Sequence, residues 1–97
     1  MTLSVVDNAD LRRFEARTPE GGVAGFVEYV PRAQAILIVH TEVDPAFKGQ
    51  GLGSIVVRGA LDLLRADGRR AVVECPFVQR FLQRHPGEYD DVVVAPV

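Results

Sequence analysis

The stretch Lys48-Gly49-Gln50-Gly51-Leu52-Gly53 decides the fold of this chain, because three alternate glycines separate a β-like apolar run from a helical pattern. A glycine has no Cβ, so its backbone can adopt positive φ and approach a ligand closely. Successive N–H groups of such a turn can point at one phosphate, and the helix that begins near Gly53 adds unpaired N–H groups and the positive end of its dipole. The segment therefore predicts an anion site between a strand and a helix.

Two better-known phosphate loops fit this spacing poorly. A Walker A loop places Lys and then Ser or Thr after its last glycine, whereas here Lys48 comes first and Ser54 follows Gly53 directly. A dinucleotide fingerprint has two residues between its last two glycines, and here only Leu52 separates them. A different phosphate loop is the favoured interpretation. The alternative is a glycine-rich turn with a purely structural role, although such a turn would need neither three glycines nor a cation.

Length and composition indicate one globular domain over residues 1–97. A chain of 97 residues buries about 60–65% of its unfolded surface in a single core. Its apolar residues (47%) and charged residues (25%) are typical of an ordinary soluble protein. The longest apolar runs fall far short of the roughly twenty residues that cross a bilayer, and no signal-peptide pattern precedes them. We therefore expect a cytoplasmic protein without a membrane partner.

Charge and cysteine content argue against two further classes. The net charge is −2 and the basic residues are scattered, so we do not expect nucleic acid as a partner. The single cysteine, Cys75, cannot form an internal disulfide, and with two distant histidines it makes a poor zinc set. The expected protein therefore lies in a reducing compartment and holds no metal.

Hydrophobic periodicity predicts five strands and two helices. Strands are expected at residues 4–8, 11–17, 23–30, 35–43 and 70–75. The second of these counts Leu11 among its apolar positions, and the third is expected to be covered on both faces. Apolar residues at three- and four-residue steps predict one helix after the glycines, with Gly68 as its C′ residue, and another over 77–84. A helical crossover allows the last two strands to lie parallel. Residues 90–97 hold either a short strand or an ordered tail.

The glycine run and its preamble resemble the GNAT superfamily of N-acetyltransferases. In that family the pattern Arg/Gln-x-x-Gly-x-Gly/Ala holds the pyrophosphate of acetyl-coenzyme A. Here Lys48 stands at its first position, which keeps a cation but loses the two-pronged guanidinium. The stretch from Val39 to Phe47 looks like the family's central strand, short turn and aromatic lead-in. The resemblance covers about residues 3–93. It implies an α+β fold with a mixed sheet and splayed central strands, a minimal domain without the usual N-terminal helix pair and with its last strands reduced.

What remains is similar to a small single-domain GNAT-like subfamily, on the segments His40-Thr41-Glu42-Val43, Cys75 and His85-Pro86-Gly87-Glu88-Tyr89. The resemblance implies that acetyl-coenzyme A is the acyl donor and that an unidentified amine is the acceptor. A homodimer is left open. The implied coenzyme site consists of Thr41, Val43, Lys48, Gly49, Gln50, Gly51, Leu52 and Gly53, with the first two pairing through their main chain with the pantetheine arm.

The same resemblance implies that the central and fifth strands separate and hold the thioester in the gap. His40 and Cys75, at the ends of these strands, are then expected to meet there. His40, or Glu42 through a water, could accept the proton of the attacking amine. Cys75 could instead carry the acetyl group as an acyl-cysteine. The alternatives are an ordinary strand histidine and a buried structural cysteine.

The family's usual leaving-group acid is a tyrosine on the helix after the fifth strand, and the matching position falls near Phe81 or Leu82. That tyrosine is therefore absent. Tyr89 or His85 could reach the thiolate instead, although Tyr89 is better suited to anchor the tail.

Three functions stay open from the sequence. The first is an acetyl-coenzyme A-dependent N-acetyltransferase. The second is a binding module for coenzyme A or acyl-coenzyme A with little turnover, and the third is a protein-interaction domain whose glycine loop is purely structural. Arg80 and Arg84, one helical turn apart, could touch coenzyme phosphates or form a solvated basic face.

Overall fold

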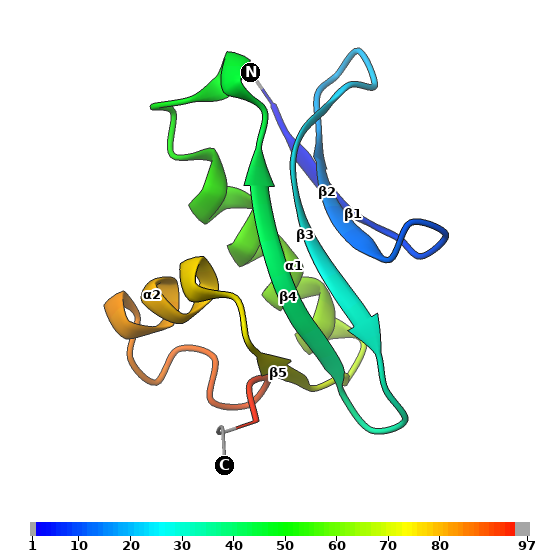
Figure 1. The fold of residues 1–97 in the computed structure, drawn as a ribbon, viewed down its shortest axis with the longest axis vertical. Coiled ribbons are helices and arrows are strands. Elements are labelled where there is room, and N and C mark those ends of the chain that lie inside the picture. Colours follow the sequence, from blue (N-terminus) through cyan, green and yellow to red (C-terminus); the bar gives the residue numbers. More distant parts are fainter. Residues whose placement is uncertain (1, 95–97) are drawn as a thin grey trace.

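The computed structural model describes residues 2–94, which form one five-stranded sheet and two α-helices (Figure 1). The last residues of the expected terminal segment, 95–97, lie outside this range. The strands are β1 (Ser4–Asn8), β2 (Arg13–Arg17), β3 (Val23–Pro31), β4 (Ile36–Val43) and β5 (Ala71–Val73). The helices are the 3-10 turn η1 (Pro45–Phe47), α1 (Leu52–Ala66) and α2 (Pro76–Arg84). The predicted α+β fold and element order are confirmed.

The order of strands in the sheet follows the sequence, β1-β2-β3-β4-β5. The first four strands are antiparallel neighbours, and β5 lies parallel to β4 after the crossover through α1. The β4–β5 ladder is short, since it runs only from the pair Ile36–Ala71 to the pair Ile38–Val73. Beyond Ile38, β4 continues to Val43 without β5 beside it. The central strands are therefore splayed, as predicted.

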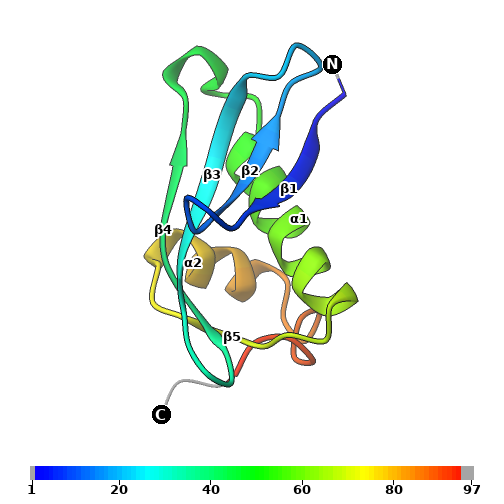
Figure 2. The same cartoon turned by 90° about the vertical axis from the view of Figure 1, so that its right-hand side faces the viewer.

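Both α-helices pack on the same face of the sheet and share one core with it (Figure 2). Side chains of β2, β3 and β4 meet side chains of α1 and α2 there, among them Phe14, Tyr29, Ile38, Val57, Leu61, Leu64, Val78 and Phe81. Along β3, the core-facing Val27 is 1% exposed, whereas Phe26 and Glu28 are only half-buried. The expectation that this strand is covered on both faces is wrong, because both helices lie on one side.

The second strand begins two residues later than expected. Leu11 lies in the β1–β2 turn and is 55% exposed, so its assignment to the strand is wrong. The turn has its own geometry: the side chain of Asn8 accepts a hydrogen bond from the Leu11 N–H at 3.3 Å, and Arg12 takes a positive φ of 54°. Periodicity alone does not reveal such a turn.

The C-terminal segment is anchored on α1 and adds one bridge to the sheet. Val93 pairs with Ala71 in an isolated parallel bridge, so the segment is a remnant of a strand within the described residues. The Tyr89 hydroxyl donates to Asp62 at 2.8 Å, and the Arg65 guanidinium contacts both carboxylate oxygens of Asp91, at 2.7 and 2.9 Å. The structure thus supports the prediction that Tyr89 anchors the tail.

Within residues 2–94, no helix combines the length and the apolar character that crossing a bilayer requires.

Candidate functional site

The glycine loop follows directly from η1. Asp44 closes that turn, because its carboxylate accepts from the Ala46 N–H at 2.9 Å and its carbonyl accepts from the Phe47 N–H at 2.9 Å. The chain then passes through Gly49 and Gly51 with φ of 80° and 69°, a region that other residues adopt only with strain. A Cβ on either glycine would meet no atom within 4 Å. The loop is therefore open on the side where these hydrogens point.

The first turn of α1 exposes backbone donors. Gly51 is the N-cap and supplies no side-chain hydrogen bond, and the first helical bond runs from Ile55 N–H to the Gly51 carbonyl at 3.3 Å. The N–H groups of Leu52, Gly53 and Ser54 consequently precede the first helical bond and have no carbonyl partner in the helix. The first turn also contains no acidic residue. Free donors and the helix dipole together favour an anion at this end.

Gly53 has a different role from the one expected. It lies inside α1 and is not among the glycines with positive φ. A Cβ at this position would come within 2.4 Å of Cζ of Phe77, the second residue of α2. The expectation that Gly53, like Gly49 and Gly51, adopts a positive φ is therefore wrong. This glycine instead allows the first turns of α1 and α2 to pack against one another.

The gap between β4 and β5 opens at the carbonyl of Ile38, which accepts hydrogen bonds from the N–H groups of Glu74 at 2.9 Å and Cys75 at 3.2 Å. On the other edge of β4, the Asp44 N–H donates to Ala24 at 2.8 Å, and Val43 pairs with Gly25. Because hydrogen-bonding direction alternates along a strand, the N–H and C=O groups of Thr41 and Val43 point away from β3 into the gap. These are the two positions predicted for main-chain pairing.

An irregularity in β4 produces this arrangement. Glu28 of β3 pairs with His40 and the next residue, Tyr29, pairs with Ile38, so Val39 is an extra residue without a partner. Such a bulge shifts the alternation by one residue. The Ile38 side chain, before the bulge, lies in the core, whereas the His40 side chain, two residues later, is exposed on the open face. The main-chain groups that face the gap change from even to odd positions at the same place.

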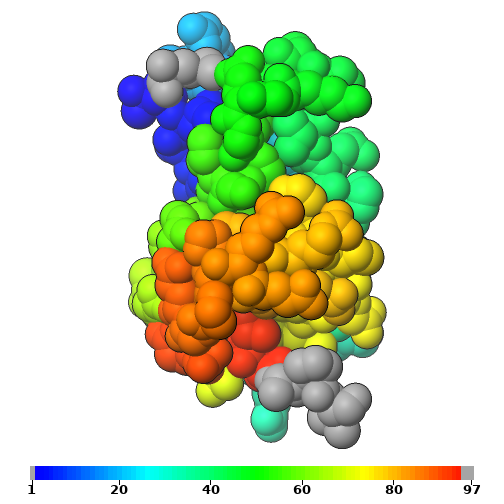
Figure 3. Space-filling view, turned by 90° about the vertical axis from the view of Figure 1, so that its left-hand side faces the viewer, coloured from blue at the N-terminus to red at the C-terminus, as the bar shows by residue number. Residues whose placement is uncertain are grey.

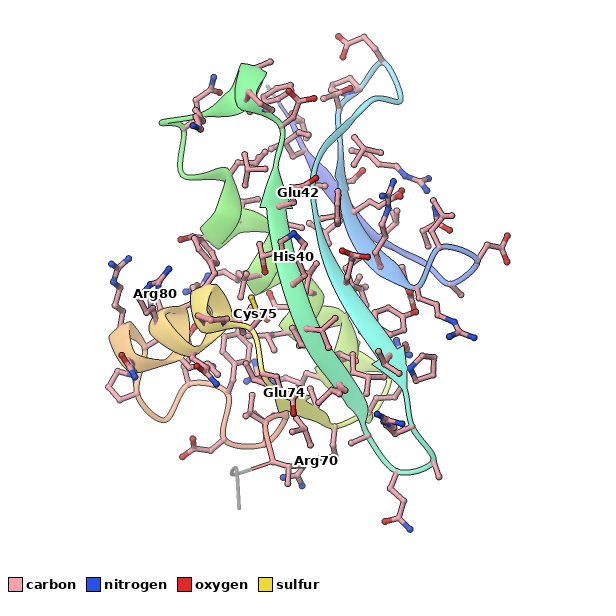
Figure 4. All side chains as sticks on the ribbon, in the orientation of Figure 1. His40, Glu42, Arg70, Glu74, Cys75 and Arg80 are labelled. Carbon is pink, nitrogen blue, oxygen red and sulfur yellow. The ribbon has the colours of Figure 1, made fainter. Side chains whose placement is uncertain are left out.

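The structure does not bring His40 and Cys75 together. The Cys75 side chain is 3% exposed and its Sγ lies 3.4 Å from Oγ1 of Thr41, on the helix-covered face. His40 precedes Thr41 in the strand and therefore points to the opposite, open face, where its side chain is 52% exposed. Figure 4 shows His40 and Glu42 along β4, and Cys75 beside the first turn of α2. The expectation that the two reactive side chains meet is wrong.

The open face around His40 carries two side chains that sequence reasoning missed, Arg13 and Phe26. Nε2 of His40 lies 3.4 Å from Oε1 of Glu42, and the His40 ring stands edge-on to Phe26 with centroids 6.5 Å apart. A pocket of about 540 Å³ adjoins them, lined by Arg13, Val23, Gly25, Phe26, Glu42, Val43, Asp44 and Pro45. From the sequence, the alternation along β3 puts Phe26 on the face opposite Val27 and Tyr29. Its place in the pocket wall follows only from the finding that no helix covers that face.

Arg13 is held over this pocket. Its guanidinium carbon lies 4.4 Å from the centroid of the Phe26 ring, and its Nε donates to Glu15 at 2.6 Å. Burial alone would raise the pKa of Glu15, but hydrogen bonds from Arg13, Arg17 and Asn8 outweigh it and lower that pKa. Glu15 therefore stays ionised and fixes the cation at the rim of the pocket.

The alternative leaving-group acids are occupied elsewhere. Burial and the hydrogen bond to Asp62 raise the pKa of Tyr89 to about 12, and its hydroxyl is committed to α1. The His85 ring packs on Phe81 with centroids 4.5 Å apart, and its Nδ1 lies 3.3 Å from Glu88. Neither side chain contacts β4 through these interactions. As for metals, no three His, Cys, Asp or Glu side chains among the described residues form a group suited to an ion.

Comparison with known proteins adds a family to this geometry. A family model described as GCN5-related N-acetyl-transferase matches residues 13–92, which include the glycine loop, the gap and both α-helices. Among curated proteins, bovine Protein NATD1 is 34% identical over 59 residues, a match that covers 61% of this chain and 51% of the relative. Streptothricin acetyltransferase of Streptomyces lavendulae is 38% identical over 64 residues, covering 64% of this chain and 34% of the relative. The matches thus span about half of the first relative and a third of the second.

Solved structures share the fold at low sequence identity. A GCN5-like protein from Staphylococcus aureus, determined by NMR, superposes with a TM-score of 0.69 at 21% identity, covering 98% of this chain and 91% of that one. The ribosomal-protein-S18-alanine N-acetyltransferase of Escherichia coli gives a TM-score of 0.62 at 15% identity, covering 88% and 76%. At these identities the likeness concerns the fold alone.

Proposed function

Because this chain belongs to the GCN5-related N-acetyltransferase family, we propose that it transfers the acetyl group of acetyl-coenzyme A to an amine. One observation carries the proposal: the N-terminus of α1 presents N–H groups without helical partners behind two glycines whose missing Cβ atoms leave the loop open. The names of two similar proteins point to different acceptors, streptothricin and the alanine of ribosomal protein S18. The acceptor of this chain is therefore left at the level of an amine.

The residues on hand fit the proposed donor. Gly51, Leu52 and Gly53 offer N–H groups to a pyrophosphate, and Lys48 places a cation beside them. Thr41 and Val43 offer the main-chain groups that can pair with the two amides of a pantetheine arm in the gap. When bound, acetyl-coenzyme A supplies a thioester whose acetyl group passes to the amine nitrogen while the coenzyme thiol departs. The chain's task is to hold that carbonyl at the open edge of β4.

The acceptor amine would approach from the open face, because α1 and α2 fill the other side of the sheet. An alkylammonium has a pKa of about 10 and must lose a proton before its nitrogen can attack. His40 is exposed on that face and can take the proton at its imidazole, and the Glu42 carboxylate lies 3.4 Å from its Nε2. We assign His40 as the general base on this ground.

Cys75 offers a second route, in which its thiolate takes the acetyl group from the coenzyme and the amine then displaces it. Sγ lies against Thr41, one of the residues at the gap, so the route is compatible with the position of the side chain. Its burial at 3% exposure and its separation from His40 across the sheet favour direct transfer. A binding module with little turnover is the remaining candidate, and it is favoured by the hydroxyls of Tyr29 and Tyr89, which donate to Asp7 and Asp62 and not into the gap.

Gly51→Val should weaken coenzyme binding at least tenfold without unfolding the protein. A side chain at this positive φ costs about 1–2 kcal/mol and projects a Cβ into the space proposed for the pyrophosphate. Gly68→Val is the matched control, since Gly68 has nearly the same φ, 67°, and equally open surroundings at the far end of α1. Calorimetric titration with acetyl-coenzyme A should show at least a tenfold weaker Kd for the first variant only. Equal affinities in both variants would make the loop purely structural.

His40→Gln should lower kcat by about 10²–10⁴-fold, because glutamine keeps a polar group on the strand but cannot take the proton. The KM for acetyl-coenzyme A should change little, since the side chain lies on the face opposite the helices. His85→Gln provides the control with the chain's other histidine, which packs on Phe81. An assay of coenzyme A release over a panel of amines measures both. Full activity of the His40 variant, or an equal loss in the His85 variant, would count against the assignment.

Cys75 should remain unmodified during direct transfer. We expect intact-protein mass spectrometry after brief incubation with acetyl-coenzyme A to show no acetyl adduct, and Cys75→Ala to keep most of the transfer activity. An adduct that forms in the wild type and disappears in Cys75→Ala would establish the acyl-cysteine route in place of direct transfer. Circular dichroism of the variant controls for loss of packing at this buried position.

A further inference from the structure

Two segments of this acidic chain, residues 45–61 and 76–87, lack acidic residues. The chain has 13 Asp and Glu residues and a net charge of −2, yet residues 45–61 and 76–87 contain no Asp or Glu. The same segments carry four basic residues, Lys48, Arg58, Arg80 and Arg84. The first segment contains the glycine loop and the start of α1, and the second contains α2. These two segments therefore carry a positive charge of their own, of which the Arg58 share is offset by Glu88.

The two segments lie together in space. Phe77 in the first turn of α2 covers Gly53 so closely that a Cβ there would come within 2.4 Å of its ring. In Figure 3, the green loop that precedes α1 and the yellow-orange helix α2 occupy the same face of the molecule, one above the other. Basic side chains of α2 that share the direction of Phe77 consequently project from the side of α2 that packs on the first turn of α1.

Arg80 is the basic residue that meets this condition best. It follows Phe77 by three positions, so the two side chains project from the same side of α2, and Figure 4 shows Arg80 on the outer surface of that helix. Arg58 is already paired with Glu88. Arg80, in contrast, has no carboxylate within 4.0 Å in the ion pairs of residues 2–94 and is exposed.

We propose that Arg80 recognises the 3′-phosphate of coenzyme A, so that this protein distinguishes coenzyme A from 3′-dephospho-coenzyme A. The inference rests on the proposed coenzyme site. Coenzyme A carries its negative charge in two places, the pyrophosphate and the phosphate on its ribose. With the pyrophosphate bound by the N-terminus of α1 and Lys48, a separate cation has to bind the 3′-phosphate. An arginine suits this role because its guanidinium group can donate two parallel hydrogen bonds to two oxygens of one phosphate. No acidic side chain of either segment opposes it.

Calorimetric titration of the wild-type protein and of two variants with coenzyme A and with 3′-dephospho-coenzyme A tests the assignment. The wild type should bind coenzyme A about tenfold more tightly, the size expected for hydrogen bonds to a charged group. Arg80→Gln should lose this preference by weakening coenzyme A alone and leaving the affinity for the dephospho form unchanged. Arg84→Gln removes the same charge one turn further along α2 and should keep the preference, which separates a local contact from a general field.

Equal affinity of the wild-type protein for both ligands would overturn the inference and leave the proposed coenzyme site standing. So would an Arg80→Gln variant that keeps the preference, or that weakens both ligands equally, or an Arg84→Gln variant that loses the preference to the same extent. Failure of the wild-type protein to bind either ligand would overturn both this inference and the proposed function.

Discussion

The extra residue in β4 is the constraint on which the rest of the site depends. Up to Ile38, the strand pairs with β5 and fills the core. After Val39 the alternation is shifted, so Thr41 and Val43 turn their main-chain groups towards an edge that β5 has already left. Without the bulge, the same edge would carry the groups of even-numbered residues, and the histidine would point into the helix layer. One unpaired residue thus sets both the open edge and the face on which His40 stands.

The sheet divides the proposed chemistry between its two sides. The proposed phosphate loop, α1 and α2 belong to the covered side, where the N-terminus of α1 and the absence of Asp and Glu from residues 45–61 favour an anionic ligand. The open side presents His40 and Glu42 next to a pocket with Phe26 at its wall. A thioester held at the edge of β4 would be within reach of both sides. In the proposed reaction, this arrangement would let the donor and the acceptor enter from different sides of the sheet.

Local sequence patterns predicted the elements well, because the apolar periodicities of β1, β3, β4 and α1 are strong and the glycine loop punctuates them. Local patterns failed where tertiary contacts determine the direction of a side chain or the role of a glycine. The bulge at Val39 has no signature in the sequence, so His40 and Cys75 were expected on one side. In the sequence, Gly53 resembles its neighbours Gly49 and Gly51. The structure shows that a glycine is required there because the ring of Phe77, 24 residues later in the chain, packs against it. Arg13 lies at the pocket only because β2 pairs with β3, a long-range contact that local sequence patterns do not reveal.

Amide NMR spectra recorded during titration with coenzyme A test the central claim most directly, because they report on each N–H group separately. The account predicts that the largest shift changes fall on residues 49–54, with a second group at Thr41 and Val43 and little change in the turn around Leu11. Shifts confined to the open-face pocket around Phe26, or spectra that do not change at residues 49–54 at millimolar coenzyme, would contradict it.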